Sequence, residues 1–206
     1  MKNLFFIGMT LLASVFVSCS KEDDNDPQPD TSTKEMYIDA TSQKDWHYFS
    51  FSKGEIIGSD ADSIGAEQWA ARKDWDIAIC RYNIRTNSGE FTKADAKGGV
   101  YTFDGATKFE SVNKVPSGAV FVTDKSFTTI GMGGVVTTQT RSDATVILFK
   151  KKEDGSLIMP PVFLQAPVYV FRTADGAGYY KVQFTQYQND SSVAGHVRFN
   201  FALITQ

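Results

Sequence analysis

Two methionines, Met132 and Met159, carry soft thioether sulfurs in segments where a methionine is unusual. Met132 stands among the glycines of residues 131–134, which supply none of the apolar neighbours that surround a methionine in a core. Met159 is followed by two prolines, which cannot donate to a sheet ladder. Residues 157–164 are therefore expected to form a stiff, exposed apolar segment, and exposed apolar segments usually bind something.

Two thioethers on separate segments are suited to a soft metal. Cu(I) is one option, although a copper site would be expected to add further sulfur ligands or histidines. A second option is a flat hydrophobic cofactor whose metal has an open axis on both faces, and haem is the main candidate. The candidate walls of such a site are the neighbouring apolar residues Phe127, Ile130, Val162 and Phe163. The residue pattern alone favours a third option, a contact surface for another protein.

Residues that could perform catalysis are not arranged for it in the sequence. There is no nucleophile elbow, no zinc-binding His-Glu-x-x-His and no phosphate loop. His47 lies among aromatic residues of an expected strand, and His196 lies on the polar face of another. The acids Asp60, Asp62 and Glu67 are close in sequence, but one acidic loop is usually only solvated. We therefore expect a binding protein, not an enzyme.

The first 18 residues have the charged, apolar and small-residue order of an export signal. Their apolar run, residues 4–17, is shorter than the ~20 residues of a bilayer-spanning helix, so it is expected to be cleaved. Residues 16–19, Phe-Val-Ser-Cys, resemble a bacterial lipobox, which implies that Cys19 carries the lipid. Acyl chains on one residue can hold a protein at a membrane without a spanning helix. The alternative is an ordinary cleavable signal.

Residues 19–34 are expected to be the lipidated cysteine and a flexible acidic tether. Residues 20–34 hold five acids and no apolar residue apart from two prolines, so burial cannot offset the entropy of ordering them. An acidic run after a lipidated cysteine resembles the surface-export signal of Bacteroidota lipoproteins. This resemblance implies an outer-membrane lipoprotein exposed at the cell surface. The alternative is a solvated spacer that faces the periplasm.

Residues 35–206 are expected to form one domain with a sizeable core. The whole chain has a formal net charge of only -3, so nothing indicates a nucleic-acid partner. With Cys19 lipidated, Cys80 has no partner for a disulfide. Cys80 lies in a strand-like stretch, and we expect it to be buried and inert.

Short runs of β-branched and aromatic residues, separated by Gly, Asp, Asn, Ser and Pro, predict an all-β antiparallel domain with two packed sheets. One short helix is expected at residues 66–73. The Asp-Gly-Ala-Gly of residues 175–178 is expected to be a hairpin turn. In the last strand Val197, Phe199, Phe201 and Leu203 should face inward. The expected strands are residues 35–40, 45–51, 75–84, 99–103, 119–123, 135–139, 145–149, 168–172, 179–187 and 196–204.

Three stretches resemble the HmuY-like haem-binding lipoproteins of Bacteroidota. They are Trp-His-Tyr-Phe-Ser-Phe-Ser-Lys-Gly at 46–54, Lys-Asp-Trp-Asp-Ile-Ala-Ile-Cys-Arg-Tyr-Asn-Ile-Arg-Thr-Asn-Ser-Gly at 73–89 and Tyr-Tyr-Lys-Val-Gln-Phe at 179–184. The second stretch is the specific one, and the similarity spans most of the mature domain. The resemblance implies an all-β, hand-shaped fold that holds haem between projecting loops with two axial ligands.

Some members of that family use two histidines as ligands and others use methionines. This sequence has no histidine between His47 and His196, so the resemblance implies that Met132 and Met159 ligate haem (iron protoporphyrin IX). It also implies capture of haem from host haemoproteins, delivery to a TonB-dependent outer-membrane receptor, and a homodimer linked by haem. The alternatives are a surface module for a glycan or host protein and a binder of another tetrapyrrole.

Overall fold

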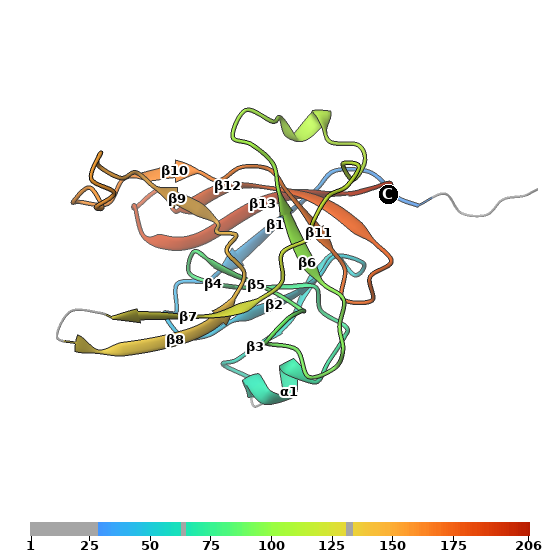
Figure 1. Cartoon of the computed structure of the whole chain (residues 1–206), viewed down its shortest axis with the longest axis horizontal. Helices are drawn as coiled ribbons and strands as arrows, with labels where there is room; N and C mark the ends of the chain where they lie inside the picture. Colours follow the sequence, from blue (N-terminus) through green and yellow to red (C-terminus); the bar gives the residue numbers. More distant parts are fainter. Residues whose placement is uncertain (1–28, 63–64, 131–133) are drawn as a thin grey trace, which may run out of the picture.

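Antiparallel strands make up most of the regular structure in the computed structural model, which describes residues 29–62, 65–130 and 134–206 (Figure 1). The predicted all-β antiparallel fold with one short helix is confirmed. The helix α1 (Ala66–Ala70) ends before the predicted residue 73, because Ala71 is already its C-cap. The 3₁₀ turn η1 (Phe109–Ser111) was not predicted.

The larger sheet has five strands in the order β1-β13-β12-β11-β6. Val197, Phe199 and Phe201 of its longest strand are buried as predicted, but Leu203 is only half-buried. The prediction for Leu203 was wrong because the opposite face of this strand is also covered there, and Ile204 packs in a second apolar cluster with Phe109 of η1. The strands are β1 (Lys34–Asp39), β6 (Gly99–Thr102), β11 (Tyr169–Arg172), β12 (Tyr179–Gln188) and β13 (Ala194–Ile204).

The smaller sheet has four strands in the order β3-β2-β4-β5. The single strand predicted for residues 75–84 was wrong, because the chain reverses at Arg81 with a φ of 56°. The Arg81 guanidinium fixes this turn by donating from Nη1 to the carbonyls of Thr41 (3.2 Å) and Ala194 (2.8 Å). The strands are β2 (His47–Ser50), β3 (Glu55–Ser59), β4 (Ile77–Cys80) and β5 (Asn83–Thr86), of which β3 was not predicted.

The two sheets pack face to face through aromatic side chains, as the prediction of two packed sheets required. The ring of Phe49 in β2 meets the rings of Phe199 and Phe201 in β13 edge-on, with centroids 5.4 Å apart in both pairs. On the other side of the smaller sheet, Tyr48 stacks on Trp69 of α1 at 4.1 Å. The smaller sheet is therefore covered on both faces, by the larger sheet and by the helix.

Two hairpins project from the same side of the molecule (Figure 1). The β7–β8 arm consists of β7 (Lys125–Ile130) and β8 (Val136–Arg141), and the β9–β10 arm consists of β9 (Ile147–Phe149) and β10 (Phe163–Gln165). Neither β7 nor β10 was predicted. The strand predicted for residues 119–123 was wrong, since Val122 forms only an isolated bridge to Val100.

The described chain starts on the side opposite the two arms (Figure 1). The predicted turn at residues 175–178 is confirmed and connects β11 to β12. Strand β1 begins at Lys34, the last residue of the predicted tether. The predicted signal, Cys19 and most of the tether lie outside the described residues. Within the described ranges, no helix has the length and apolar character needed to span a membrane.

Candidate functional site

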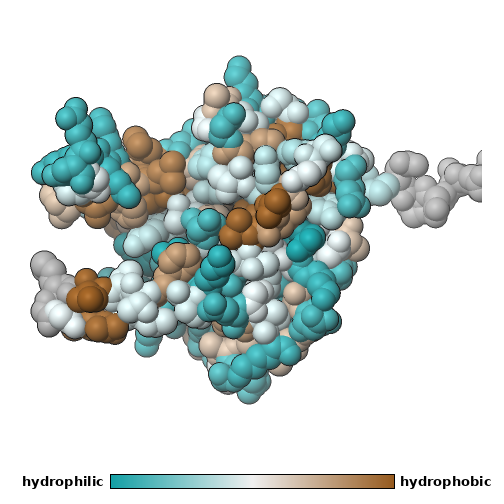
Figure 2. All heavy atoms as spheres, in the orientation of Figure 1, coloured by the Kyte–Doolittle hydropathy of each residue, from teal (hydrophilic) through white to brown (hydrophobic). Residues whose placement is uncertain are grey.

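The two arms stand apart and leave an open cleft between them (Figure 2). At the root of the β9–β10 arm, Tyr82 from the turn between β4 and β5 packs edge-on against Phe149, with centroids 5.0 Å apart. Phe163 lies 5.6 Å from Phe149 and 5.2 Å from Tyr187 of β12. These four rings join the arm to both sheets.

Strand alternation gives the β9–β10 arm two different faces. Phe163 pairs with Phe149, and both turn toward the aromatic group at the root. Leu164 pairs with Leu148, and both point to solvent with more than two fifths of their surface exposed. Of the two predicted wall residues here, Phe163 is a half-buried packing residue, whereas Val162 is exposed.

Met159 occupies the far part of the β9–β10 arm, and 73% of its surface is exposed. Its neighbours Leu157 and Val162 are exposed too, which confirms the predicted apolar segment. The backbone on either side is fastened to the end of β9, because Lys150 donates to the Val162 carbonyl (2.9 Å) and accepts from the N–H of Ile158 (3.4 Å). The thioether of Met159 is therefore exposed to solvent, while the backbone on either side of it is held by hydrogen bonds to Lys150.

The β7–β8 arm also has two faces, and they separate the two wall residues predicted there. Phe127 pairs with Gln139, and Ile130 pairs with Val136. Side chains three positions apart on a strand point to opposite faces, so one face of this arm cannot present both Phe127 and Ile130. Ile130 is 75% exposed, while Phe127 is half-buried beneath the Arg141 guanidinium.

Met132 lies outside the described residues, between Ile130 and Gly134 in the sequence. Apart from Ile130 and its cross-strand partner Val136, this face of the arm is hydroxylic. Cross-strand hydroxyl pairs join Ser126 to Thr140 (3.2 Å) and Thr128 to Thr138 (3.0 Å). This hydroxyl ladder was missed by the sequence analysis, because these residues have no apolar alternation.

Strand β7 is attached to the smaller sheet by the carboxylate of Asp124. This buried side chain accepts hydrogen bonds from the backbone N–H (2.9 Å) and the hydroxyl (2.8 Å) of Thr86 in β5. Burial raises the pKa of Asp124 to about 7, against the opposing effect of the Thr86 hydrogen bonds. Gly89 also packs tightly here, since an added Cβ would stand 2.3 Å from the Asp124 carbonyl oxygen.

Strand β8 is attached to the same sheet by the buried guanidinium of Arg85. This group lies between the rings of Trp46 and Phe91, 3.9 and 3.8 Å from their centroids. It donates to the carbonyl of Thr140 in β8 (2.9 Å) and to the Tyr48 hydroxyl (3.2 Å). Arg85 belongs to residues 73–89, the stretch that carries the specific family resemblance, and this stretch therefore forms the root of the β7–β8 arm.

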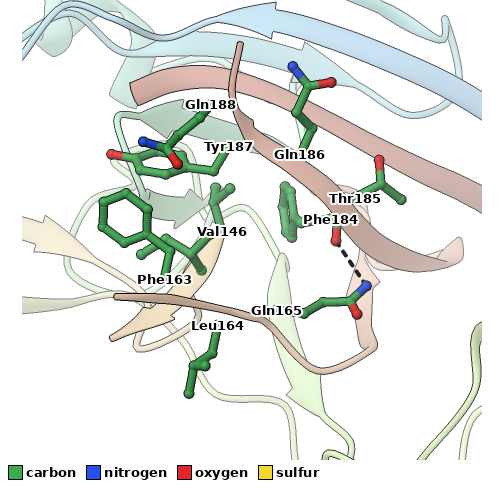
Figure 3. Close-up of a pocket in the computed structure, with 10 residues that line it drawn as sticks. Val146, Phe163, Leu164, Gln165, Phe184, Thr185, Gln186, Tyr187 and Gln188 are labelled. Carbon is green, nitrogen blue, oxygen red and sulfur yellow. Dashed lines mark hydrogen bonds between the residues drawn. The ribbon is translucent and has the colours of Figure 1, made fainter. Parts of the chain in front are cut away.

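A cavity of about 290 Å³ opens at the root of the β9–β10 arm, between β10 and β12 (Figure 3). Phe163, Phe184 and Tyr187 contribute apolar walls, and the Gln165 amide donates to the Phe184 carbonyl at 3.5 Å. Its volume is at the low end for small-molecule pockets. This cavity has no local signal in the sequence, because it depends on β12 continuing beyond Tyr169, the first residue of β11.

The other reactive side chains have structural partners. The Tyr37 hydroxyl lies 2.6 Å from Nδ1 of His196, and burial lowers the pKa of His47. Asp60 accepts a hydrogen bond from the Tyr48 hydroxyl, which gives this carboxylate a structural role. Cys80 is fully buried, as predicted, and burial raises the pKa of its thiol to about 11. In the part of the chain that the structure describes, no three His, Cys, Asp or Glu residues are grouped to hold a metal.

Several solved structures share this fold. A protein of Bacteroides vulgatus ATCC 8482, described as HmuY-like and heme-binding, is 25% identical with a TM-score of 0.60, and the match covers 84% of this chain and 92% of that chain. A protein of Bacteroides fragilis NCTC 9343, described as a lipoprotein, is 20% identical with a TM-score of 0.57 over 84% and 89% of the chains. The apo HmuY analog of Tannerella forsythia is 23% identical with a TM-score of 0.55 over 86% and 99%.

No curated protein sequence matches the chain. The family model of the HmuY protein, in contrast, matches residues 42–201, which include both arms, the whole smaller sheet and the larger sheet apart from β1 and the end of β13. This match covers well over half of the chain and agrees with the resemblance found in residues 46–54, 73–89 and 179–184. The chain belongs to the HmuY family.

Proposed function

We propose that this protein binds haem in the cleft between its two arms, with Met132 and Met159 as the axial ligands of the iron. The observation that carries the proposal is the exposed thioether of Met159, held on a tethered arm beside an open cleft. Membership of the HmuY family supports it, as does the likeness to a protein described as heme-binding. The proposal makes this a binding protein, not an enzyme.

The chemistry of the available side chains fits such a ligand. A thioether is a soft donor suited to haem iron. In this proposal Phe127 and Val162 are the wall residues, and Phe163 supports the β9–β10 arm from behind. Ile130 lies on the other face of its arm and would contact the ligand only at the rim. Bound haem would bury the exposed apolar residues near both arm tips, and this burial would contribute favourably to the free energy of binding.

Thioether ligation has two consequences that separate it from ligation by histidine. Methionine favours the softer ferrous iron, so reduction should tighten binding. Methionine also has no ionisable proton, whereas a histidine ligand begins to protonate near its ordinary pKa of ~6.5. We therefore expect the two bonds to iron to survive mild acid.

The proposal extends to a place in the cell. A lipid on Cys19 would anchor the protein at the outer membrane, with the acidic tether directing it to the cell surface. One protein of similar fold is described as a lipoprotein. Because the described chain starts opposite the arms, an anchor there would leave the cleft facing away from the membrane. Haem would come from host haemoproteins, pass to a TonB-dependent receptor and link two copies in a homodimer.

A second candidate function is a surface module that contacts a host protein or glycan. It is favoured by the exposed pair Leu148 and Leu164, which lies on the solvent-facing side of the β9–β10 arm. Such a module would give no Soret change with haem. Another tetrapyrrole would bind in the same cleft. The two cases differ in whether binding of the ligand requires iron.

An anaerobic titration of the purified protein with ferric haem, followed by reduction with dithionite, tests the proposal. We expect a six-coordinate spectrum and tighter binding of the ferrous form. Equal affinity for both oxidation states, or a sharp loss of binding between about pH 7 and pH 5, would contradict thioether ligation. The absence of any Soret change would contradict haem binding itself.

A further inference from the structure

Two cations are direct cross-strand partners at the root of the β7–β8 arm. Lys125 of β7 pairs with Arg141 of β8. Like charges placed directly opposite each other on a sheet are destabilising. In the described residues, neither side chain has a carboxylate oxygen within 4.0 Å. The pair therefore has an unfavourable charge arrangement that the protein itself does not neutralise.

The nearby acids already have other hydrogen-bond partners or lie beyond ion-pair distance. Glu90 accepts the backbone N–H of Ser126, and Asp124 accepts from Thr86. Burial lowers the pKa of Arg141, and Tyr82, Asp143 and Asp124 only partly oppose this effect. An added anion would therefore stabilise the half-buried Arg141 guanidinium, beside which Lys125 is exposed.

The guanidinium of Arg141 is held in a defined position. Its Cζ lies 4.1 Å from the centroid of the Phe127 ring, and Nη1 donates to the Ser142 carbonyl at 2.8 Å. Only one of its donors is used within the described residues, and the planar group can bind a carboxylate through two of the others. Phe127, Arg141 and Lys125 share one face of the arm, since Phe127 and Lys125 are two positions apart.

Arg141 lies near the root of the other arm. Tyr82 is close enough to Arg141 to influence its pKa, and the Tyr82 ring packs on Phe149 at the root of the β9–β10 arm. The cation pair therefore lies at the inner end of the cleft. An aromatic ring stands beside it, and the exposed apolar residues are at the arm tips.

We propose that Arg141, assisted by Lys125, binds a carboxylate of the planar ligand and so sets which edge of that ligand enters the cleft first. This inference rests on the proposed function, because haem carries two propionates on one edge. The propionate edge would lie toward the arm root, and the apolar edge would lie toward the tips. Arg141 is then a specificity-determining residue that acts on the ligand periphery, independently of the metal.

The test uses the purified protein and two iron-free probes, protoporphyrin IX and its dimethyl ester, in one detergent-containing buffer. Binding is followed by porphyrin fluorescence. We expect the wild type to prefer the free acid by at least about 10-fold, as for a hydrogen bond to a charged group. Arg141→Gln should remove most of this preference and leave binding of the ester unchanged. Arg141→Lys should keep part of it, and added salt should reduce it.

Arg198 supplies a matched control. It also lies over an aromatic ring, with Cζ 5.1 Å from the centroid of Tyr37, but it pairs with Glu35 in the larger sheet, outside the arms. Arg198→Gln should keep the full preference for the free acid. Circular dichroism of each variant checks that the fold is retained.

Two outcomes would overturn the inference. The first is a wild type that shows no preference for the free acid. The second is an Arg141→Gln variant that binds both probes equally weakly. That result would mean that Arg141 only packs on Phe127. If the preference appears while haem gives no Soret change, the carboxylate site stands and axial ligation fails. If neither iron-free porphyrin binds while haem gives a Soret change, the carboxylate site is wrong and axial ligation stands. If haem also gives no Soret change, both proposals are wrong.

Discussion

Asp124 accepts hydrogen bonds from both the backbone N–H and the hydroxyl of Thr86, and through them the start of β7 is attached to the end of β5. Arg85, the neighbour of Thr86, attaches β8 through the Thr140 carbonyl. Both strands of the projecting arm are thus attached to adjacent residues of β5, the edge strand of the smaller sheet. The β7–β8 arm is attached at one end, and its orientation depends on the buried polar contacts of Asp124 and Arg85 there.

The carboxyl of Asp124 predicts a specific pH dependence of stability. Its pKa is raised from 3.8 to about 7 in the folded state, so folding favours the protonated form. The stabilising contribution is fully present below pH 3.8 and is lost as the pH rises through 7, by at most about 1.4 kcal/mol per pH unit. Asp124→Asn should flatten the fall in unfolding free energy between pH 5 and pH 7.5, as measured by urea denaturation.

Asp76 provides an internal comparison for that experiment. Burial raises its pKa to about 6, and it accepts the backbone N–H groups of Phe51 and Ala174. Asp76→Asn should therefore alter the profile at lower pH than Asp124→Asn does. Superimposable profiles for the wild type and Asp124→Asn would show that the Asp124 carboxyl does not titrate as described.

Removing the buried guanidinium of Arg85 should strongly destabilise the protein. Arg85→Ala leaves a gap between Trp46 and Phe91 and deprives Tyr48 and Thr140 of a donor. We expect a loss of about 3 kcal/mol or more in unfolding free energy.

The control for Arg85 is Arg72, which also covers a tryptophan ring, Trp69, but is paired with Asp74 at the surface. Arg72→Ala should cost about 1 kcal/mol or less. Equal losses for the two variants in chemical denaturation would mean that the guanidinium of Arg85 does not support the arm root.

Gly89 tests how closely the arm root is packed. Gly89→Ala combines an unfavourable positive φ of 54° with a Cβ only 2.3 Å from the Asp124 carbonyl oxygen. Gly118 has a φ of 74° but open space around it, so Gly118→Ala reports the backbone cost alone, about 1 kcal/mol. We expect a clearly lower melting temperature for Gly89→Ala than for Gly118→Ala. Equal melting temperatures would show that the root can shift to make room.

Strands with one buried face show a period of two in the sequence. Val197, Phe199 and Phe201 alternate with polar residues and pack against the other sheet, so their period of two is visible. Strand β7 lacks this pattern, because it has no buried face and half of its residues are hydroxylic. The reversal at Arg81 was missed because its stabilising contacts come from Thr41 and Ala194, far away in sequence.

The candidate site was only partly predictable for the same reason. The exposure of Met159 follows from its local sequence, because two prolines prevent a buried strand. The separation of Phe127 from Ile130 depends on β7 being a strand, since only a strand gives those positions opposite faces. The pairing of Lys125 with Arg141 depends on the register of two strands and has no local signal.

The most direct test of the central claim is a Soret titration of the wild type, Met132→Ala, Met159→Ala and Met36→Leu with reduced haem. Met36 lies in β1, outside both arms, and serves as the matched control. Wild type and Met36→Leu are predicted to give a six-coordinate ferrous spectrum, and each arm variant is predicted to lose it. Retention of that spectrum by both arm variants would contradict ligation by Met132 and Met159.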